Sequence, residues 1–537
     1  MLLTVTTFLP LFGALLCLLL PREEEGLLRG FAFTVALLTF GVSLFMLGDF
    51  DPTKWNHLVD KEWVAAFGIH FKLAVDGISL WLVLLTTFLM PIVLCASWSS
   101  IEKKTREFVV AMLILETGMI GTFLATDLFV FYTFWEVMLI PMYFIIGIWG
   151  GDRKLYAAIK FVLYTMVGSL LMIVAIIYLY IRNHDATGIW TFDYDTLLKV
   201  VLSPREQLFC FGAFALAFCI KVPLFPFHTW LPDAHTDAPT AGSVILAAVM
   251  LKMGTYGFLR FSLPILPDAS RTFVPMMVIL SIIGIVYGAL VALAQKDWKR
   301  LVAYSSVAHM AMVMLGMFAL NPVGITGSII QQLNHGISTG ALFLLVGVVY
   351  ERRHTREISE YGGLSKVMPV YAAVFLVMTM SSIGLPTLNG FIGELMILQG
   401  VFVANKVWAA FAASGVVLGA AYMLYLYQRT MFGKVENVKN ENLPDLSLRE
   451  FATFAPLLAL ALWIGLYPSP FINRIQTSVQ HVIARVSPEY ANDKLAGNCD
   501  TTPKPEQIAA NTASQFLAAA PCGPDGQPLP AATTGAR

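Results

Sequence analysis

Apolar stretches close to 20 residues long recur along almost the whole chain, and they constrain its fold more than any other feature. Crossing the apolar core of a bilayer takes about 20 helical residues, and a crossing segment must satisfy its own backbone hydrogen bonds. With 57% hydrophobic and 13% charged residues, the sequence predicts an all-α polytopic membrane protein with about 14 transmembrane helices. The predicted spans are 2–20, 30–48, 78–99, 108–126, 128–149, 157–181, 208–230, 242–262, 273–295, 301–320, 323–350, 368–401, 407–428 and 452–468.

Two of these spans contain proline-rich interruptions. The seventh contains Pro223 and Pro226 in IKVPLFPFHTW, and the twelfth contains Pro386 in SSIGLPTLNG. Proline removes a helix hydrogen bond, and such breaks are tolerated at membrane depth where protein or water surrounds the freed backbone groups. We therefore predict broken helices 7 and 12. The eleventh span is also expected to be irregular, near the Asn-His-Gly sequence at 334–336.

The order of the spans indicates an internal repeat. Spans four to eight and nine to thirteen form two sets of five, each with its broken span in fourth place. Because five is odd, the second set enters the membrane with opposite polarity, as in transporters built from inverted repeats; chance agreement of the helix counts is the alternative. The predicted organisation is 1–107 for helices 1–3, 108–262 for the first repeat, 273–430 for the second inverted repeat, 431–485 for the last helix and its flanks, and 486–537 for a disordered tail.

Basic residues indicate how the chain is oriented in the membrane. The odd-numbered loops hold about twice as many lysines and arginines as the even-numbered loops, and the positive-inside rule places such loops in the cytoplasm. The N-terminal segment has neither a basic region nor a small-residue cleavage site, so it is predicted to be an uncleaved first span. Both termini, and with them the tail, are therefore expected on the outer face.

Titratable side chains within the apolar spans are the candidates for chemistry. A charge at the bilayer centre is costly and marks an ion pathway or proton relay by default. Lysine and histidine can lose a proton when desolvated, whereas arginine effectively cannot. The pattern therefore predicts proton movement. Four charged residues and two histidines lie deep in predicted spans, and no arginine is predicted to join them: Glu136, Lys221, Lys252, Glu394, His309 and His335.

Among the acids and lysines of the first half, two are expected to interact as a functional pair and two are interpreted as structural residues. Glu136 and Lys221 lie at similar depth, and a nearby carboxylate favours the charged form of a lysine. We expect a pair in which Glu136 tunes Lys221; a static ion pair between helices is the alternative. Glu116 is interpreted as a paired helix-packing group, and Lys160, near a helix end, as a lysine whose ammonium extends to the interface.

The remaining candidates are one lysine, two histidines and one glutamate in the later spans. No intramembrane glutamate precedes Lys252 on its own span, so it is expected to rest neutral. His309 and His335 titrate near neutral pH and suit a proton relay; each is equally well explained as a hydrogen-bonded core residue. Glu394 follows the second break, where a terminal proton acceptor is expected.

Motifs for metal, cluster or nucleotide binding are missing from the sequence. It has six cysteines but no C-x-x-C, no G-x-G-x-x-G and no Walker A sequence, so no metal or cofactor site is predicted in this chain. The formal net charge of zero gives no support for nucleic-acid binding. In the tail, Cys499 and Cys522 are expected either to form a disulfide or to remain as two free thiols.

Three long motifs carry a resemblance to a known family. The run FPFHTWLPDAHTDAPTAGSVILAAVMLKMGTYG, together with AYSSVAHM and LNHGISTGALFLL, resembles the proton-antiporter-like membrane subunits of respiratory complex I, of the type named subunit M in bacteria and chain 4 in mitochondria. The resemblance covers about residues 70–430. It implies fourteen spans with inverted repeats. It also implies an input pair at Glu136 and Lys221, a central relay at Lys252, bridging groups at His309 and His335, and an exit group at Glu394.

The resemblance favours one function and leaves others open. It implies a proton-translocating subunit of NADH:quinone oxidoreductase in the bacterial plasma membrane, beside other membrane subunits that include antiporter-like neighbours. FMN, Fe–S clusters and quinone sites are then expected in partner subunits and not in this chain. A subunit of a multi-subunit Na⁺/H⁺ antiporter or of a membrane-bound hydrogenase is the alternative, and a structural membrane spacer is a weaker one.

Overall fold

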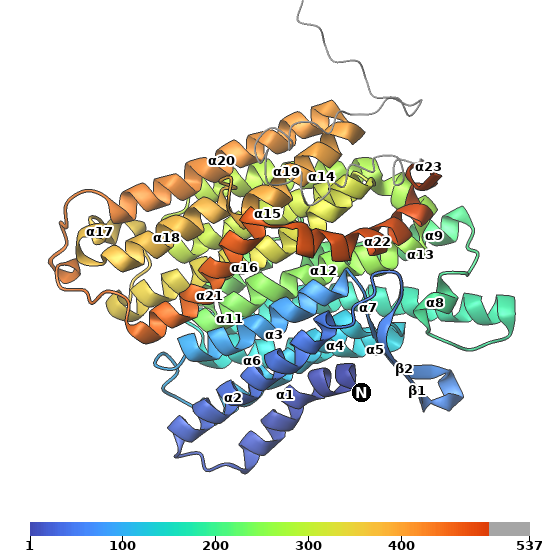
Figure 1. Cartoon of the computed structure of the whole chain (residues 1–537), viewed down its shortest axis with the longest axis horizontal. Coiled ribbons are helices and arrows are strands. Elements are labelled where there is room, and N and C mark those ends of the chain that lie inside the picture. The colour runs from blue at the N-terminus through green and yellow to red at the C-terminus, as the bar shows by residue number, and fades with distance from the viewer. Residues whose placement is uncertain (493–537) are drawn as a thin grey trace, which may run out of the picture.

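The structure, a computed structural model, describes residues 1–492, and nearly all of their regular structure is helical (Figure 1). From residue 493 onward the predicted tail lies outside the described residues. The predicted disorder is wrong for the start of 486–537, because Val486 ends one helix and Pro488–Asn492 forms another.

The helices of the first half include the first interrupted segment. They are α1 Leu2–Leu19, α2 Glu25–Leu44, α3 Ser79–Ala96, α4 Thr105–Leu124, α5 Leu128–Val137, α6 Leu139–Trp149, α7 Lys154–Thr187, α8 Tyr194–Leu197, α9 Pro204–Lys221, α10 Trp230–Asp237, α11 Thr240–Ile245, α12 Leu251–Gly257 and α13 Leu263–Ile265, with π-helical turns at Leu246–Met250 and Phe258–Ser262 and 3₁₀ turns at Phe45–Leu47 and Ala65–Phe67.

The helices of the second half contain the second interrupted segment. They are α14 Pro267–Leu293, α15 Trp298–Phe318, α16 Pro322–Arg353, α17 Leu364–Val367, α18 Pro369–Ser382, α19 Asn389–Ala404, α20 Lys406–Met431, α21 Leu448–Leu466, α22 Ser469–Val486 and α23 Pro488–Asn492, with 3₁₀ turns at Ile358–Glu360 and Val438–Asn440.

Twelve helices of the described part are long and apolar enough to cross a membrane. The two predicted spans missing from this set are 208–230 and 368–401, the ones predicted to be broken. The first of these is α9 followed by α10, and the second is α18 followed by α19. The helical membrane fold is therefore confirmed, whereas the count of fourteen spans and the division into inverted repeats remain predictions.

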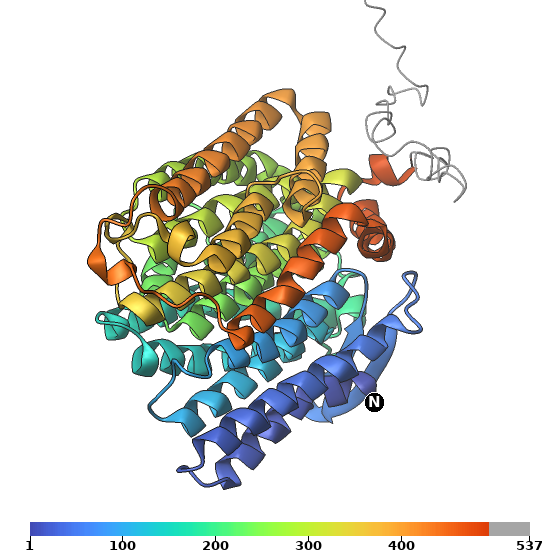
Figure 2. The same cartoon turned by 60° about the vertical axis from the view of Figure 1, so that its left-hand side comes forward.

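Helix α16 forms the centre of the core. Every residue from Gly324 to Val349 is buried, and α16 packs against α3, α11, α15, α18, α19, α21 and α22. Figure 2 shows the long helices running roughly side by side, with α1 and α2 (blue) at one edge and α20 (orange) at the opposite edge. The predicted irregularity of the eleventh span is wrong: α16 is an unbroken α-helix, because its central polar side chains bond to neighbouring helices or to the preceding turn and leave the backbone ladder intact.

The loops gather at two ends of the bundle, as the helix order requires. At one end Arg29 bonds to the carbonyl of Ile101 at 2.7 Å, and Trp149 bonds to the carbonyl of Lys103 at 2.7 Å. These residues border or lie in odd-numbered loops. At the other end Lys72 forms ion pairs with Asp193 and Asp195, which belong to an even-numbered loop.

Two elements at this second end were not predicted. Strands β1 Asn56–Val64 and β2 Ile69–Val75 form an antiparallel hairpin, which turns through Gly68 at φ +60°. Helix α22 was predicted only as a flank of the last span. It is amphipathic and packs its apolar face against α13, α14 and α16. Both are too short or too polar to register as membrane spans, which is why hydropathy alone missed them.

Candidate functional site

The chain backbone is interrupted beside several of the candidate residues. Lys221 is the last residue of α9, where Val222 and Pro223 end the helix, and Glu394 lies in the second turn of α19, after the break at Pro386. The π-helical turn Leu246–Met250 ends two residues before Lys252. Such turns are frequent at functional sites because they redirect side chains and leave backbone carbonyls free.

A row of neighbouring titratable side chains begins at Lys252. Its ammonium lies 2.6 Å from the carbonyl of Ala247 in the π-helical turn and 2.7 Å from Nδ1 of His335. The rings of His335 and His309 follow, with centroids 5.8 Å apart. Nδ1 of His309 then lies 3.3 Å from a carboxylate oxygen of Glu394. Four residues from four separate helices, α12, α16, α15 and α19, therefore form one buried series.

Polar groups surround the end of this row at Glu394. The amide of Gln331 donates to the carboxylate at 3.3 Å, and the Tyr422 hydroxyl lies 3.3 Å from Nε2 of His309. A cavity of about 20 Å³ lies against Glu394, His309, Ser382 and Tyr422. This volume is enough for about one water molecule, so the end of the row has room for a hydrated contact.

The predicted Glu136–Lys221 pair is not a direct contact. No ion pair within 4 Å joins the two among residues 1–492, although Glu136 lies near enough to influence Lys221 electrostatically. The Lys221 ammonium is buried without a hydrogen-bond partner in the described part of the chain. It lies over the rings of Trp135 and Phe161, at 5.1 and 5.8 Å from their centroids. Cation–π contacts therefore hold this charge, and a static ion pair does not.

Two histidines that the sequence analysis did not select lie after the first break. His228 and His235 are 2% and 0% exposed, and their ring nitrogens have no hydrogen-bond partner among the described residues. His235 stacks on Phe343 and lies near enough to Lys252 to sense its charge. The signal was present in FPFHTWLPDAHTDAP, where His228 lies at the end of the predicted span 208–230 and His235 follows it by seven residues, but neither histidine was selected.

The structure corrects the interpretation of two further residues. Glu116 is fully buried, and neither of its carboxylate oxygens has a hydrogen-bond partner in the described residues, so it is not a paired packing group. Lys160 does not extend freely to the interface, because its ammonium lies 2.6 Å from the Asp233 carboxylate. Local sequence did not reveal this pairing, since Asp233 belongs to α10.

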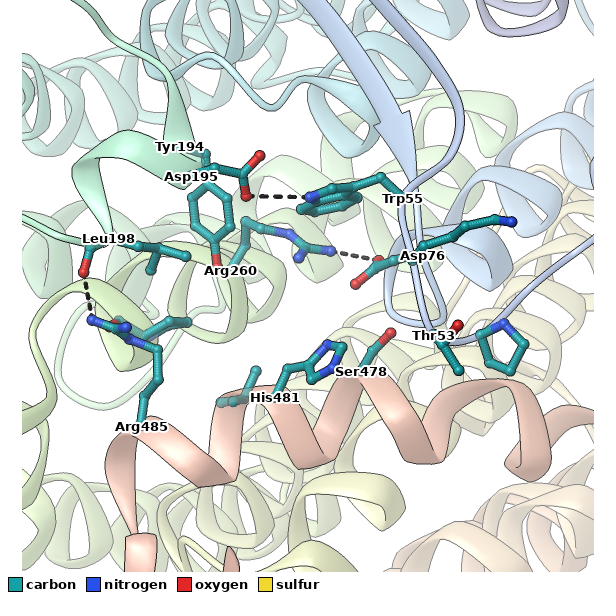
Figure 3. Close-up of a pocket in the computed structure, with 14 residues that line it drawn as sticks. Thr53, Trp55, Asp76, Tyr194, Asp195, Leu198, Arg260, Ser478, His481 and Arg485 are labelled. Atoms are coloured by element: carbon teal, nitrogen blue, oxygen red, sulfur yellow. Dashed lines mark hydrogen bonds and ion pairs between the residues drawn. The ribbon is translucent and has the colours of Figure 1, made fainter.

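An arginine is also buried, near the end of one predicted span. Arg260, two residues before the end of the predicted span 242–262, is 4% exposed and belongs to the π-helical turn Phe258–Ser262. Its guanidinium lies 2.5 Å from Asp76 and over the ring of Trp55 at 4.8 Å (Figure 3). Burial favours the neutral form of Asp76, but the charge of Arg260 outweighs it and lowers the pKa of this carboxyl below its usual value.

We expect this pair to be needed for assembly. Arg260→Gln leaves Asp76 as an unpaired buried carboxylate, and such a loss costs about 3–5 kcal/mol. The double variant Arg260→Gln/Asp76→Asn removes both charges and is expected to recover most of the lost stability. Thermal stability and the yield of assembled complex on native gels measure both effects.

The exposed Arg271–Asp268 pair provides the control for this prediction. Arg271→Gln breaks a surface ion pair, which is worth about 1 kcal/mol or less, and is expected to leave assembly unchanged. Equal assembly of Arg260→Gln and the wild type would contradict a structural role for the buried pair.

Metal binding finds no support in the described residues, where no group of three or more His, Cys, Asp or Glu side chains is arranged to hold an ion.

Comparison with known proteins identifies relatives along nearly the whole described chain. Residues 125–419, over half of the chain, match the family described as NADH:quinone oxidoreductase/Mrp antiporter, transmembrane, and residues 6–122 match the amino terminus of NADH-ubiquinone oxidoreductase chain 4. NADH-quinone oxidoreductase subunit M of Rhodobacter capsulatus is 48% identical over 495 residues, which cover 90% of this chain and 96% of that protein.

Solved structures show the same fold. A chain of respiratory complex I from Thermus thermophilus is similar with a TM-score of 0.83 and 31% identity, covering 90% of this chain and all of that one. A chain of the Mrp complex from a Dietzia species has a TM-score of 0.75 at 22% identity, covering 90% of this chain and 52% of that one. This second likeness concerns the fold alone.

Proposed function

The chain belongs to the family of NADH-quinone oxidoreductase subunit M and NADH-ubiquinone oxidoreductase chain 4, and we propose that its buried lysines, histidines and glutamates carry protons across the membrane. It is a membrane subunit of the NADH:quinone oxidoreductase complex, respiratory complex I, and works beside the other membrane subunits of that complex. Its own part in the reaction is ion translocation, coupled to the electron transfer from NADH to quinone.

The observation that carries the proposal is the contact row from Lys252 to Glu394. Each neighbouring pair in it combines a group that can donate a proton with one that can accept it. Nζ of Lys252 lies 2.7 Å from Nδ1 of His335, within hydrogen-bonding distance. When His335 is protonated and passes its proton on, His309 is the next base, and its Nδ1 lies 3.3 Å from Glu394. A purely structural core would not require four titratable groups in series at this depth.

The entry step involves Glu136 and Lys221. Because the two are separated by more than hydrogen-bonding distance, the strength of their interaction depends on small movements of α5 relative to α9. Approach of the carboxylate favours the charged form of Lys221, and withdrawal favours release of its proton. Met138 interrupts the α5–α6 helix two residues after Glu136, which gives this segment a point at which it can bend.

His228 and His235 are the candidates for the step from Lys221 to Lys252. Both lie between the two lysines in sequence, are buried, and have free ring nitrogens within the described structure. A histidine can accept a proton at one nitrogen and donate it from the other. Water molecules between these side chains would complete the path, since buried waters bridge otherwise unsatisfied polar groups.

Glu394 is the exit group in this proposal. It ends the contact row, follows the break between α18 and α19, and borders the small cavity beside Tyr422. Hydration of that cavity favours ionisation of the carboxylate and therefore release of the proton.

The energy for translocation comes from partner subunits. FMN, Fe–S clusters and quinone sites belong to those partners, and the titratable groups of this chain respond to charge or movement transmitted through the membrane arm. We further propose that the end with the odd-numbered loops faces the bacterial cytoplasm, which places both termini outside.

A second candidate function rests on the fold shared with the Mrp complex chain. A subunit of a Na⁺/H⁺ antiporter would transport sodium, whereas the proposed subunit supports NADH-driven proton transfer without it. NADH-driven acidification of reconstituted vesicles in sodium-free buffer separates the two, because an antiporter cycle stops when sodium is removed.

Glu136→Gln tests the proposed entry step. The amide keeps the shape of the side chain but removes the charge that acts on Lys221, so we expect NADH-driven proton pumping to fall by about tenfold or more, within the range typical of general acid–base groups. Glu136→Asp keeps the charge and is expected to be milder. Pumping is measured with a pH-sensitive dye in vesicles that contain the assembled complex.

The exposed Glu102 supplies the matched control. Glu102→Gln removes an equal charge at the surface and should pump as the wild type does. Wild-type turnover in Glu136→Gln would show that the pair is structural and that protons enter elsewhere.

A further inference from the structure

An apolar groove opens between α2, α3 and α21, with α16 at its floor and α22 at its mouth. Its volume is about 300 Å³. Nearly all of its lining is apolar and includes Leu84 and Phe88 of α3 and Leu333 of α16. Among the described residues that line it, Arg474 of α22 is the only one with a charge.

The groove extends over about one leaflet of a bilayer. Leu333 at its floor lies eleven residues into α16, which corresponds to about 16 Å of helix, close to half of the roughly 30 Å apolar thickness. The mouth lies just beyond the end of α21, where Trp463 and Tyr467 are 54% and 59% exposed. Exposed tryptophan and tyrosine are typical of the membrane–water interface.

Arg474 therefore lies at the level of lipid headgroups. It follows Phe471, which packs against Trp81 with ring centroids 4.6 Å apart. One guanidinium nitrogen of Arg474 donates to the carbonyl of Pro470 at 2.8 Å. No carboxylate of the described chain forms an ion pair with it, so its other donors are available. A guanidinium with free donors suits the oxygens of a phosphate.

We propose that this groove binds one phospholipid, with an acyl chain against Leu333 and its phosphate at Arg474. A single acyl chain is narrow and apolar, as the lining requires, and the phosphate satisfies the one cation at the mouth.

The bound lipid would pack against the helices that carry the row of residues from Lys252 to Glu394. Leu85 lines the groove and touches α16 at Gly336, where an added Cβ would lie 2.5 Å from a Leu85 methyl group. His335 is the residue before Gly336 on the same helix. The acyl chain therefore packs against the side of α3 and α16 that faces away from Lys252. This inference does not depend on how protons move.

Photolabelling of the assembled complex tests the proposal. The probe is phosphatidylglycerol with a diazirine in one acyl chain, incorporated into vesicles with the purified complex. After illumination, mass spectrometry is expected to find label on peptides of α3 and α16 that line the groove. Leu84→Trp fills the groove and is expected to remove most of this labelling. Arg474→Gln removes the phosphate partner and is expected to lower the labelling by about tenfold, the effect of losing one charge-assisted contact.

Two control variants make the result decisive. Leu170→Trp places the same bulk on the exposed surface of α7, where Leu170 is 53% exposed, and should leave labelling of the groove unchanged. Arg474→Lys keeps the charge and should retain most of it. Equal labelling of the groove in the wild type, Leu84→Trp and Arg474→Gln would overturn the proposal, and so would crosslinks from the groove to a neighbouring subunit in place of lipid.

Discussion

Lys221→Ala is expected to abolish most proton pumping while the complex still assembles. The lysine is the last residue of α9, is buried, and makes no hydrogen bond within the described chain. Its removal therefore eliminates a buried charge without leaving a partner unsatisfied. Because a proton carrier at this position has no substitute, pumping and coupled NADH oxidation should fall by about tenfold or more.

Arginine at the same position distinguishes charge from titration. Lys221→Arg keeps the positive charge over Trp135 and Phe161 but cannot release a proton, so it should not restore pumping. Lys434→Ala removes an exposed lysine and serves as the control that should behave as the wild type. A normal ratio of protons to electrons in an assembled Lys221→Ala complex would exclude Lys221 as a carrier.

Glu394→Gln is expected to block translocation at the last step. Glutamine keeps the size of the side chain and its contact with Gln331, but it cannot accept the proton that arrives from His309. Glu394→Lys supplies a group that can cycle with a different resting charge, so partial activity is expected. Proton pumping in reconstituted vesicles, with NADH as the donor, measures both variants.

The comparison between the two substitutions carries the inference. If the site only needed a hydrogen-bonding group, glutamine would be the better substitute; if it needs a titratable group, lysine will be. Glu436→Gln, an exposed change of the same kind, should leave pumping intact. Full activity of Glu394→Gln would move the exit to another residue, and the fully buried Glu116 would become the next acid to test.

Sequence alone predicted the membrane fold and the family, because both depend on properties of continuous segments. A stretch of about 20 apolar residues crosses a bilayer wherever it occurs, and prolines interrupt a helix through their own ring and missing N–H. Helix α9 accordingly ends at Lys221, two residues before Pro223, whereas α18 ends at Ser382, just before Gly384 at φ +75° and four residues before Pro386. The same local argument failed for α16, where Asn334 and Gly336 suggested a break but side-chain bonds to neighbours left the helix whole.

Only the tertiary structure decided which titratable groups touch. Depth along a span fixed neither the rotation of each helix nor its neighbours, so Glu136 and Lys221 at equal depth are apart while Lys252 and His335 are in contact. Arg260 lies inside because Asp76, 184 residues earlier in the chain, is there to pair with it. Hydropathy is a property of a short segment of chain. A contact between side chains depends on how segments distant in the sequence pack together, and this packing is defined only in the folded chain.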